Sequence, residues 1–116
     1  MDDLLNKRTN QYDIIPEVVD YIINKINPNK IILFGSCARG IINIDSDIDL
    51  CIVLEEGLNL KERCKLRVEL LKDIINITEY EIDLYICSKE QWLEQYEDRG
   101  TFIGKINSEG KILYGR

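Results

Sequence analysis

The chain has 116 residues, a length typical of one domain, so we expect a single domain spanning residues 1–116. Hydrophobic residues make up 45% of it, yet no apolar run is long enough to cross a bilayer and the polar N-terminus lacks the apolar stretch of a signal peptide; we therefore expect a soluble, cytoplasmic protein with no membrane partner. A net charge of -6 disfavours nucleic acid as a partner and fits a basic protein or a small anion bridged by a cation.

Apolar residues recur at helical spacing in two long segments and form three shorter strand-like segments. Together they predict an α/β (α+β) domain with a small mixed sheet flanked by helices, in the order α-β-turn-β-α-β-α-α. A short turn makes the first two strands neighbours, and the helix after the second strand allows a crossover to the third. The expected elements are a helix from Asp13 to residue 26, a strand at 30–34, a tight turn at 35–40 followed by a short helical turn, a strand at 47–54, a helix at 58–77, a strand at 80–87, short helices at 89–96 and 98–107, and an edge strand at 111–115.

The two long helices carry the most detailed expectations. Asp13 is the expected N-cap of the first helix, which puts Pro16 in the first turn, where its missing N–H is tolerated. The basic cluster of the second helix, Lys61 to Arg67, is interpreted as a solvated face, with partner docking as the alternative. The second helix is expected to bury one apolar stripe, made of Leu60, Cys64, Val68, Leu71 and Ile75.

Two absences restrict the possible chemistry. The chain has no histidine, which excludes a Ser-His-Asp triad, a His-assisted cysteine nucleophile and His-based metal sites. Its four cysteines form no C-x-x-C pair, so zinc spacing is absent, and we expect them to be reduced, half-buried filling residues: Cys37, Cys51, Cys64 and Cys87. Catalysis must then depend on carboxylates, hydroxyls, lysine or arginine.

Acidic residues stand at the start of one expected strand and within another. Asp47 and Asp49 are two apart, so both side chains point to the same face of the second strand. Asp83 has the matching position on the polar face of the third strand, where Glu81 is the rival candidate. Close carboxylates repel one another unless a cation such as Mg²⁺ lies between them. Three converging carboxylates would be enough to hold two metal ions for displacement at phosphorus.

The turn between the first two strands supplies groups that bind phosphate. Gly35 lets the backbone turn sharply, Ser36 offers a hydroxyl, and Arg39 adds a fixed positive charge. A Gly-Ser turn by itself is most often only a turn, and an acidic strand end by itself is most often solvated. The Walker phosphate loop and the EF-hand both fail here, because their required residues are absent or misplaced. The loop and the acids together favour a metal-bound triphosphate.

These residues resemble a motif of the minimal nucleotidyltransferases of the DNA polymerase beta superfamily. The motif G-S-x-A-R-G, five residues, then S-D-I-D-L stands here complete, from Gly35 to Gly40 and from Ser46 to Leu50. The segment "YEIDLYI" matches the context of the family's third acid at Asp83, and "FIGKINSEGKILYG" resembles the end of such small proteins. The resemblance extends over nearly the whole chain and implies the nucleotidyltransferase fold.

The resemblance also implies an activity and a role for each residue. Asp47, Asp49 and Asp83 would hold two Mg²⁺ ions, and Asp83 would help to deprotonate the acceptor hydroxyl. Gly35 and Ser36 would bind the triphosphate of ATP. Arg39 has a less definite role, in nucleotide binding, loop support or partner contact. The acceptor oxygen would attack the α-phosphorus, and pyrophosphate would leave.

The family members that this chain resembles also imply which molecule accepts the AMP. Aminoglycoside nucleotidyltransferases and tRNA-processing relatives carry further domains that bind the acceptor, which are not seen in this sequence. Minimal family members of this kind are often encoded beside a helical HEPN toxin and adenylylate a tyrosine of it, so a cognate HEPN toxin is the expected partner and this chain the antitoxin. The HEPN motif R-x-x-x-x-H needs a histidine, so this chain is not itself the toxin. Two alternatives remain: a non-catalytic antitoxin that acts by docking, and a transferase for a small-molecule hydroxyl.

Overall fold

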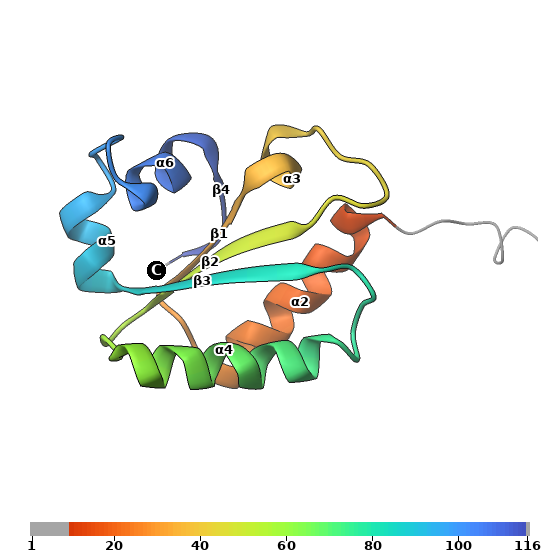
Figure 1. Ribbon diagram of the computed structural model, residues 1–116, viewed down its shortest axis with the longest axis horizontal. Coiled ribbons are helices and arrows are strands. Elements are labelled where there is room, and N and C mark those ends of the chain that lie inside the picture. Colours follow the sequence, from red (N-terminus) through yellow and green to blue (C-terminus); the bar gives the residue numbers. More distant parts are fainter. Residues whose placement is uncertain (1–9, 116) are drawn as a thin grey trace, which may run out of the picture.

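The computed structural model describes residues 10–115, and it is a four-stranded sheet with helices on both faces (Figure 1). This agrees with the predicted α/β class and element order, including the edge strand at the end. Within residues 10–115 no helix is long and apolar enough to span a membrane. The elements in chain order are α2 (Gln11–Ile26), β1 (Lys30–Phe34), α3 (Gly35–Arg39), β2 (Ile48–Leu54), α4 (Leu60–Ile74), β3 (Ile82–Ser88), α5 (Lys89–Gln95), α6 (Phe102–Glu109) and β4 (Lys111–Gly115).

The sheet has the strand order β3-β2-β1-β4. β1 pairs antiparallel with β2 and with β4, whereas β2 and β3 are parallel. The parallel pair requires a crossover connection, which α4 provides, and the antiparallel β1–β2 pair needs only the short α3 and a loop. β1 is buried at its three central positions.

One face of the sheet is covered by α2 and α4 and forms the main core. Alternate residues of the strands point into it, as the period of two requires. Ile48, Leu50 and Ile52 of β2 are fully buried here, and Ile82, Leu84 and Ile86 of β3 belong to the same core. The helices contribute Ile15, Val18, Val19, Ile22, Leu70 and Ile74.

The opposite face is only partly covered. α5 and α6 pack over one end of it through Trp92, Ile103 and Ile106, which surround Cys51 and Cys87 of the sheet. The other end of this face, where β2 and β3 begin, lies outside that cluster. Carboxylates can stand on the face there because no apolar layer would have to desolvate them.

The first helix begins earlier than predicted. Its N-cap is Asn10, whose side chain accepts the backbone N–H of Tyr12 at 2.9 Å, while Asp13 accepts the N–H of Asn10 at 3.0 Å. The prediction of Asp13 as N-cap was therefore wrong, because Asp13 is the reciprocal residue of a capping box. Pro16 consequently lies beyond the first turn, inside the helix.

The predicted buried stripe of the second helix was also wrong. α4 buries Leu70 and Ile74 against the sheet, with Leu66 packed beside them. The expected stripe instead faces outward: Leu60, Val68 and Ile75 keep 68%, 65% and 71% of their surface exposed, Cys64 is exposed, and Leu71 is half-buried. Both sets have helical spacing, so periodicity alone did not distinguish them. The other three cysteines are buried, which corrects the half-buried expectation for all four.

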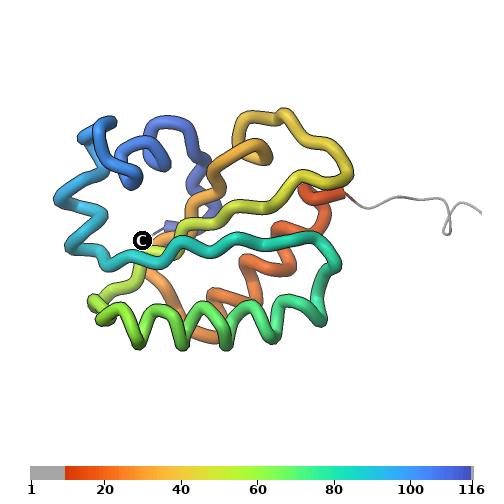
Figure 2. Tube along the Cα trace, in the orientation of Figure 1, coloured from red at the N-terminus to blue at the C-terminus, as the bar shows by residue number. Residues whose placement is uncertain are grey.

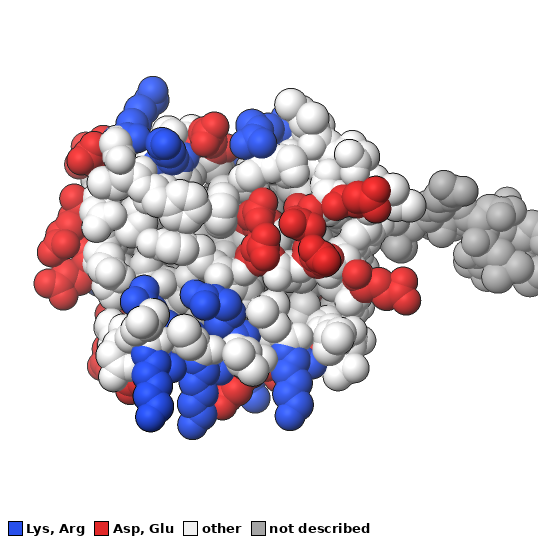
Figure 3. All heavy atoms as spheres, viewed as in Figure 1, with Lys and Arg blue, Asp and Glu red and all other residues white. Residues whose placement is uncertain are grey.

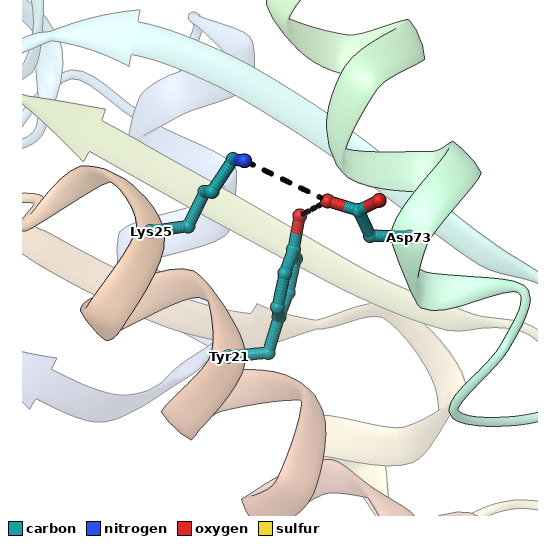
Figure 4. A network of polar contacts seen from close by, with 3 residues as sticks. All are labelled: Tyr21, Lys25 and Asp73. Atoms are coloured by element: carbon teal, nitrogen blue, oxygen red, sulfur yellow. Dashed lines mark hydrogen bonds and ion pairs between the residues drawn. The ribbon is translucent and has the colours of Figure 1, made fainter.

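A polar contact connects the two helices of the main core (Figure 4). The hydroxyl of Tyr21 on α2 donates a hydrogen bond to Asp73 on α4, and Lys25 lies 3.9 Å from the same carboxylate oxygen. Burial, followed by the bond to Asp73, raises the pKa of Tyr21 well above its ordinary value. The contact fixes how α4 lies against α2, and so where α4 stands beside β3.

Candidate active site

Three strands bring the predicted site residues together at the open end of the sheet. In the strand register Asp49 of β2 pairs with Phe34 of β1 on one side and with Asp83 of β3 on the other. The residue before β3, Glu81, accepts the backbone N–H of Ile48 at 2.9 Å through its carbonyl, which aligns the beginnings of the two strands. The two carboxylates predicted on separate strands therefore stand directly opposite each other.

Gly35 stands against Asp49 where β1 turns into α3. Its φ of 72° lies in the left-handed region, which glycine adopts without the strain of a side chain. A Cβ at this position would lie 2.1 Å from Oδ2 of Asp49. The helix α3 begins at Gly35 itself, so the tight turn predicted at 35–40 is helical from its first residue. The missing side chain allows the backbone to touch the carboxylate.

The carboxylates of this site interact strongly. The pKa of Asp49 is raised from 3.8 to about 6, first because burial penalises the charged form and next because of the charge of Asp83. Hydrogen bonding with Asp83 and the charge of Asp47 raise it further, while the charge of Arg39 opposes them. Asp49 is half-buried and Asp83 is exposed. The site thus concentrates negative charge that a cation would neutralise.

Asp47 is held by its backbone and by the loop before it. The thiol of Cys37 donates to the carbonyl oxygen of Asp47 at 3.3 Å. Gln11, which is almost fully buried, donates through Nε2 to the carbonyl oxygens of Asn43 at 2.7 Å and Ser46 at 3.0 Å. The 40–47 loop therefore returns to the start of α2 (Figure 2). Gln11 could not be identified from the sequence, because a glutamine in a polar stretch carries no signal of burial.

The remaining loop residues lie near the carboxylates. Ser36 is half-buried, and its carbonyl accepts the N–H of Ile41 at 3.1 Å. Arg39 is exposed on α3, within electrostatic reach of Asp49. The hydroxyl of Tyr12 on α2 donates a hydrogen bond to the carbonyl oxygen of Cys37 at 2.9 Å, which connects α2 to α3. All the predicted loop residues therefore lie on or next to the short helix that contacts Asp49.

A hollow of about 380 Å³ opens beside Asp49 and Asp83. Phe34 and Tyr85 each make an edge-on ring contact with Phe102 of α6, with centroids 5.8 and 4.9 Å away. The same hollow is bordered by Arg67 and Leu71 of α4. The hollow could not be predicted from the sequence, because its walls come from five separate elements. It can receive a flat, partly apolar group next to the carboxylates.

This arrangement is accompanied by a sequence match. The family model of the nucleotidyltransferase domain matches residues 15–108, which include the glycine turn and all three acids. The chain belongs to the nucleotidyltransferase domain family. No curated protein sequence is significantly similar to this nucleotidyltransferase.

Solved structures with the same fold agree with this family. A candidate nucleotidyltransferase from Sulfolobus solfataricus is 17% identical, with a TM-score of 0.59, over 90% of this chain and 79% of that one. A toxin–antitoxin structure with AMP-PNP is 22% identical, with a TM-score of 0.53, over 86% and 73%. A tyrosine-to-alanine mutant of the toxin–antitoxin pair MntA-HpeT is 24% identical, with a TM-score of 0.53, over 94% and 75%. At these identities the likeness establishes the fold of the nucleotidyltransferase alone.

The acids of this nucleotidyltransferase do not form a closed metal cage. Over residues 10–115 no group of three carboxylate or thiol side chains is arranged tightly enough to be a ready-made metal site. Asp49 and Asp83 meet, and Asp47 acts on Asp49 through its charge. Glu81 and Asp47 both border a second hollow of about 250 Å³. Mutual repulsion gives the physical reason for the spread, since carboxylates approach more closely when a cation screens them.

Proposed function

We propose that the chain transfers AMP from Mg-ATP to a hydroxyl group, and that the acceptor is a tyrosine of a cognate HEPN-type toxin, so that the chain acts as an antitoxin. The observation that carries the proposal is the pairing of Asp49 with Asp83 across parallel strands, with the backbone of Gly35 against Asp49. Carboxylates next to a glycine turn suit a site that receives a metal-bound triphosphate. The family membership supports the same reaction type.

The residues present fit Mg²⁺ as a resident ion. The raised pKa of Asp49 results in part from neighbouring carboxylates, and a divalent cation would remove that repulsion. Mg²⁺ prefers carboxylate oxygens together with phosphate oxygens. Asp47, Asp49 and Asp83 would hold two ions, which would supply charge stabilisation at the reacting phosphate. Glu81 is the rival of Asp83 as the third acid.

The chain's own groups would then perform the transfer. Gly35 and Ser36 would bind the triphosphate, with Arg39 as a nearby positive charge. The acceptor hydroxyl would enter from the side of Asp83, which would take its proton as the oxygen attacks the α-phosphorus. The new bond joins that oxygen to phosphorus, the bond to the bridging oxygen breaks, and pyrophosphate leaves. The products are an AMP ester and pyrophosphate.

The partner is inferred from three observations. Two solved structures similar to this chain are of toxin–antitoxin assemblies, and one of those contains AMP-PNP. The minimal nucleotidyltransferases that the motif resembles act on HEPN toxins. The aromatic wall of the hollow beside Asp83 also suits a tyrosine ring, since aromatic rings pair favourably edge to face.

The direct test is the intact mass of the acceptor. The protein encoded in the adjacent reading frame, if it carries R-x-x-x-x-H, is incubated with this chain, ATP and Mg²⁺. We expect it to gain the mass of one or more AMP units, and to gain none with Asp47→Asn. A stable complex without any gain would reject the transfer reaction and favour an antitoxin that acts by docking. Transfer of AMP to a small molecule with a hydroxyl group, without any transfer to the protein, would reject the protein acceptor.

The choice of third acid gives a separate prediction. Asp83→Asn is expected to lower the turnover at least about 100-fold while changing ATP affinity only a few-fold, because a general base contributes to the chemical step. Glu81→Gln is the matched control, being an exposed acid of the same segment, and should lower turnover less than about threefold. Single-turnover rates and nucleotide affinities measure the two effects. The reverse ranking would assign the third acid to Glu81.

A further inference from the structure

The outward face of α4 carries an apolar row, of which only Leu71 packs against the core. Leu60, Cys64, Val68, Leu71 and Ile75 recur every three or four residues, and we call them the α4 stripe. Four of the five are exposed, and Leu71 is half-buried. Single exposed apolar residues are common on protein surfaces, but a continuous helical row of them typically marks an interaction surface.

The exposure of the α4 stripe does not result from loose packing of α4 against the core. The helix already packs against the sheet through a different row, which includes Leu70 and Ile74. The contact of Tyr21 with Asp73 fixes the rotation of α4, because Asp73 lies on the side turned toward α2. Rolling the helix to bury the α4 stripe would remove both contacts.

Basic residues border the α4 stripe on both sides. At about 100° per residue, Arg67 falls between the α4 stripe and the buried row, whereas Arg63 falls within the buried row. On its other side stands a row of exposed lysines, and the acids of α4 fall beyond that row. Figure 3 shows blue side chains over α4, below the acidic centre of the same face. The lysines are Lys61, Lys65 and Lys72.

This charge pattern identifies the kind of partner. The chain as a whole has a net charge of -6, so a helix face with basic residues on both borders is a local reversal. A second copy of the chain would place basic borders against basic borders, and like charges brought together in this way are destabilising. A surface with an apolar ridge and acidic borders would match both the α4 stripe and its charges.

The α4 stripe also reaches the candidate active site. Leu71 belongs to the stripe and borders the hollow beside Asp49 and Asp83. Arg67 borders the same hollow and donates through Nε to the carbonyl oxygen of Leu84 at 3.1 Å, which holds it against the edge strand β3. A protein seated on the α4 stripe would therefore lie beside the carboxylates.

We propose that the α4 stripe and its basic borders dock the acceptor protein, through an apolar ridge flanked by aspartate or glutamate, and so direct its hydroxyl into the hollow. This rests on the proposed function only for the identity of the partner as the acceptor. Docking on α4 places the partner on the side of Asp83, from which the hydroxyl would enter. It also gives the basic cluster Lys61 to Arg67 the docking role that the sequence left as an alternative.

The test separates docking from chemistry. Val68→Asp and Leu60→Asp place a negative charge in the α4 stripe, and Leu93→Asp makes the same change at a 58% exposed leucine of α5. Binding to the adjacent-frame protein is measured by calorimetry, transfer by intact mass, ATP affinity by titration, and folding by thermal melting. We expect each α4 variant to weaken the complex at least about 30-fold, the effect typical of a central interface residue. Leu93→Asp should change binding less than about threefold.

Charge is tested without touching the apolar contacts. Lys65→Glu should slow association about tenfold at low salt, and that difference should disappear at high salt. ATP affinity should remain unchanged in all of these variants. Asp47→Asn should lose transfer yet bind the partner like the unmodified chain, so a failed reaction and a failed docking surface give different results.

Two outcomes would overturn the docking surface. One is binding of Val68→Asp to the acceptor protein within about twofold of the unmodified chain. The other is sedimentation showing that the chain alone forms a dimer which Val68→Asp breaks, since a second copy would then occupy the α4 stripe. A complex that Val68→Asp abolishes, in the absence of any AMP transfer, would reject the proposed reaction and retain the docking surface.

Discussion

Asp49→Asn is expected to lower the rate of AMP transfer at least about 10³-fold. Asp49 is the central carboxylate, since it lies opposite Asp83 and against Gly35. Charge stabilisation by a bound metal contributes several kcal/mol to the transition state, and a loss of about 4 kcal/mol corresponds to about 10³ in rate. An amide cannot replace the negative charge that the metal needs. Turnover at saturating ATP and Mg²⁺ measures the loss.

The same substitution is expected to stabilise the protein without Mg²⁺. The pKa of Asp49 is raised from 3.8 to about 6 in the folded state, so the folded chain binds the proton more tightly than the unfolded chain does. Stability should therefore fall as pH rises from about 4 to about 6, and the loss is complete above the folded pKa. The full shift would correspond to about 3 kcal/mol, which solvent screening of a half-exposed group reduces to about 1–2 kcal/mol.

Denaturant unfolding at pH 3.5 and pH 8 checks both parts of this prediction. In the absence of Mg²⁺, Asp49→Asn should be more stable than the unmodified chain at pH 8 and equal to it at about pH 3.5. Adding Mg²⁺ should stabilise the unmodified chain and leave the variant unchanged. Asp20→Asn, an exposed aspartate of α2, is the matched control and should alter neither stability nor turnover. Full activity of Asp49→Asn would remove Asp49 from the site.

Gly35→Ala is expected to lower turnover at least about 100-fold while leaving the chain folded. A Cβ at Gly35 would lie 2.1 Å from Oδ2 of Asp49 and 3.0 Å from its Cγ, so the carboxylate must move. Misplacing a reacting group by about 1 Å can cost about 10²-fold in rate. The positive φ adds about 1–2 kcal/mol of instability for any residue with a Cβ.

Gly40→Ala separates these two effects. Gly40 has nearly the same φ, 77°, but a Cβ there would have nothing within 4 Å. Both variants should lose about 1–2 kcal/mol of stability, and only Gly35→Ala should lose most of its turnover. Unfolding curves and turnover numbers measure the pair. Equal loss of turnover in both variants would mean that backbone strain, and not contact with Asp49, explains the requirement for glycine.

The sequence predicted the sheet better than it predicted the helices. Every second residue of β2 and β3 is apolar, from Ile48 to Leu54 and from Ile82 to Ile86, so their inward faces followed from the period of two. The start of α2 was misplaced because Asn10 and Asp13 are both good caps, and spacing alone does not say which one caps the helix. The α4 stripe and the buried row of the same helix have the same period, so periodicity alone could not identify which row packs against the sheet.

The candidate site was predicted in the same uneven way. Gly35, Asp47 and Asp49 lie within one short segment of the sequence, and the antiparallel pairing of β1 with β2 brings Gly35 against Asp49. Asp83 was placed on the correct face of β3, but its position opposite Asp49 depends on the strand register. Gln11 and the aromatic wall carried no local signal, because each depends on contacts between segments far apart in the chain.

The sequence by itself determined the strands and the sharp turn at Gly35, because these depend on neighbours a few residues away. Only the tertiary structure decided that Asp83 pairs with Asp49 and that α4 presents its α4 stripe to the outside. Both depend on how the crossover helix docks on the sheet. That docking is set by packing and by the contact of Asp73 with Tyr21, which no local pattern encodes.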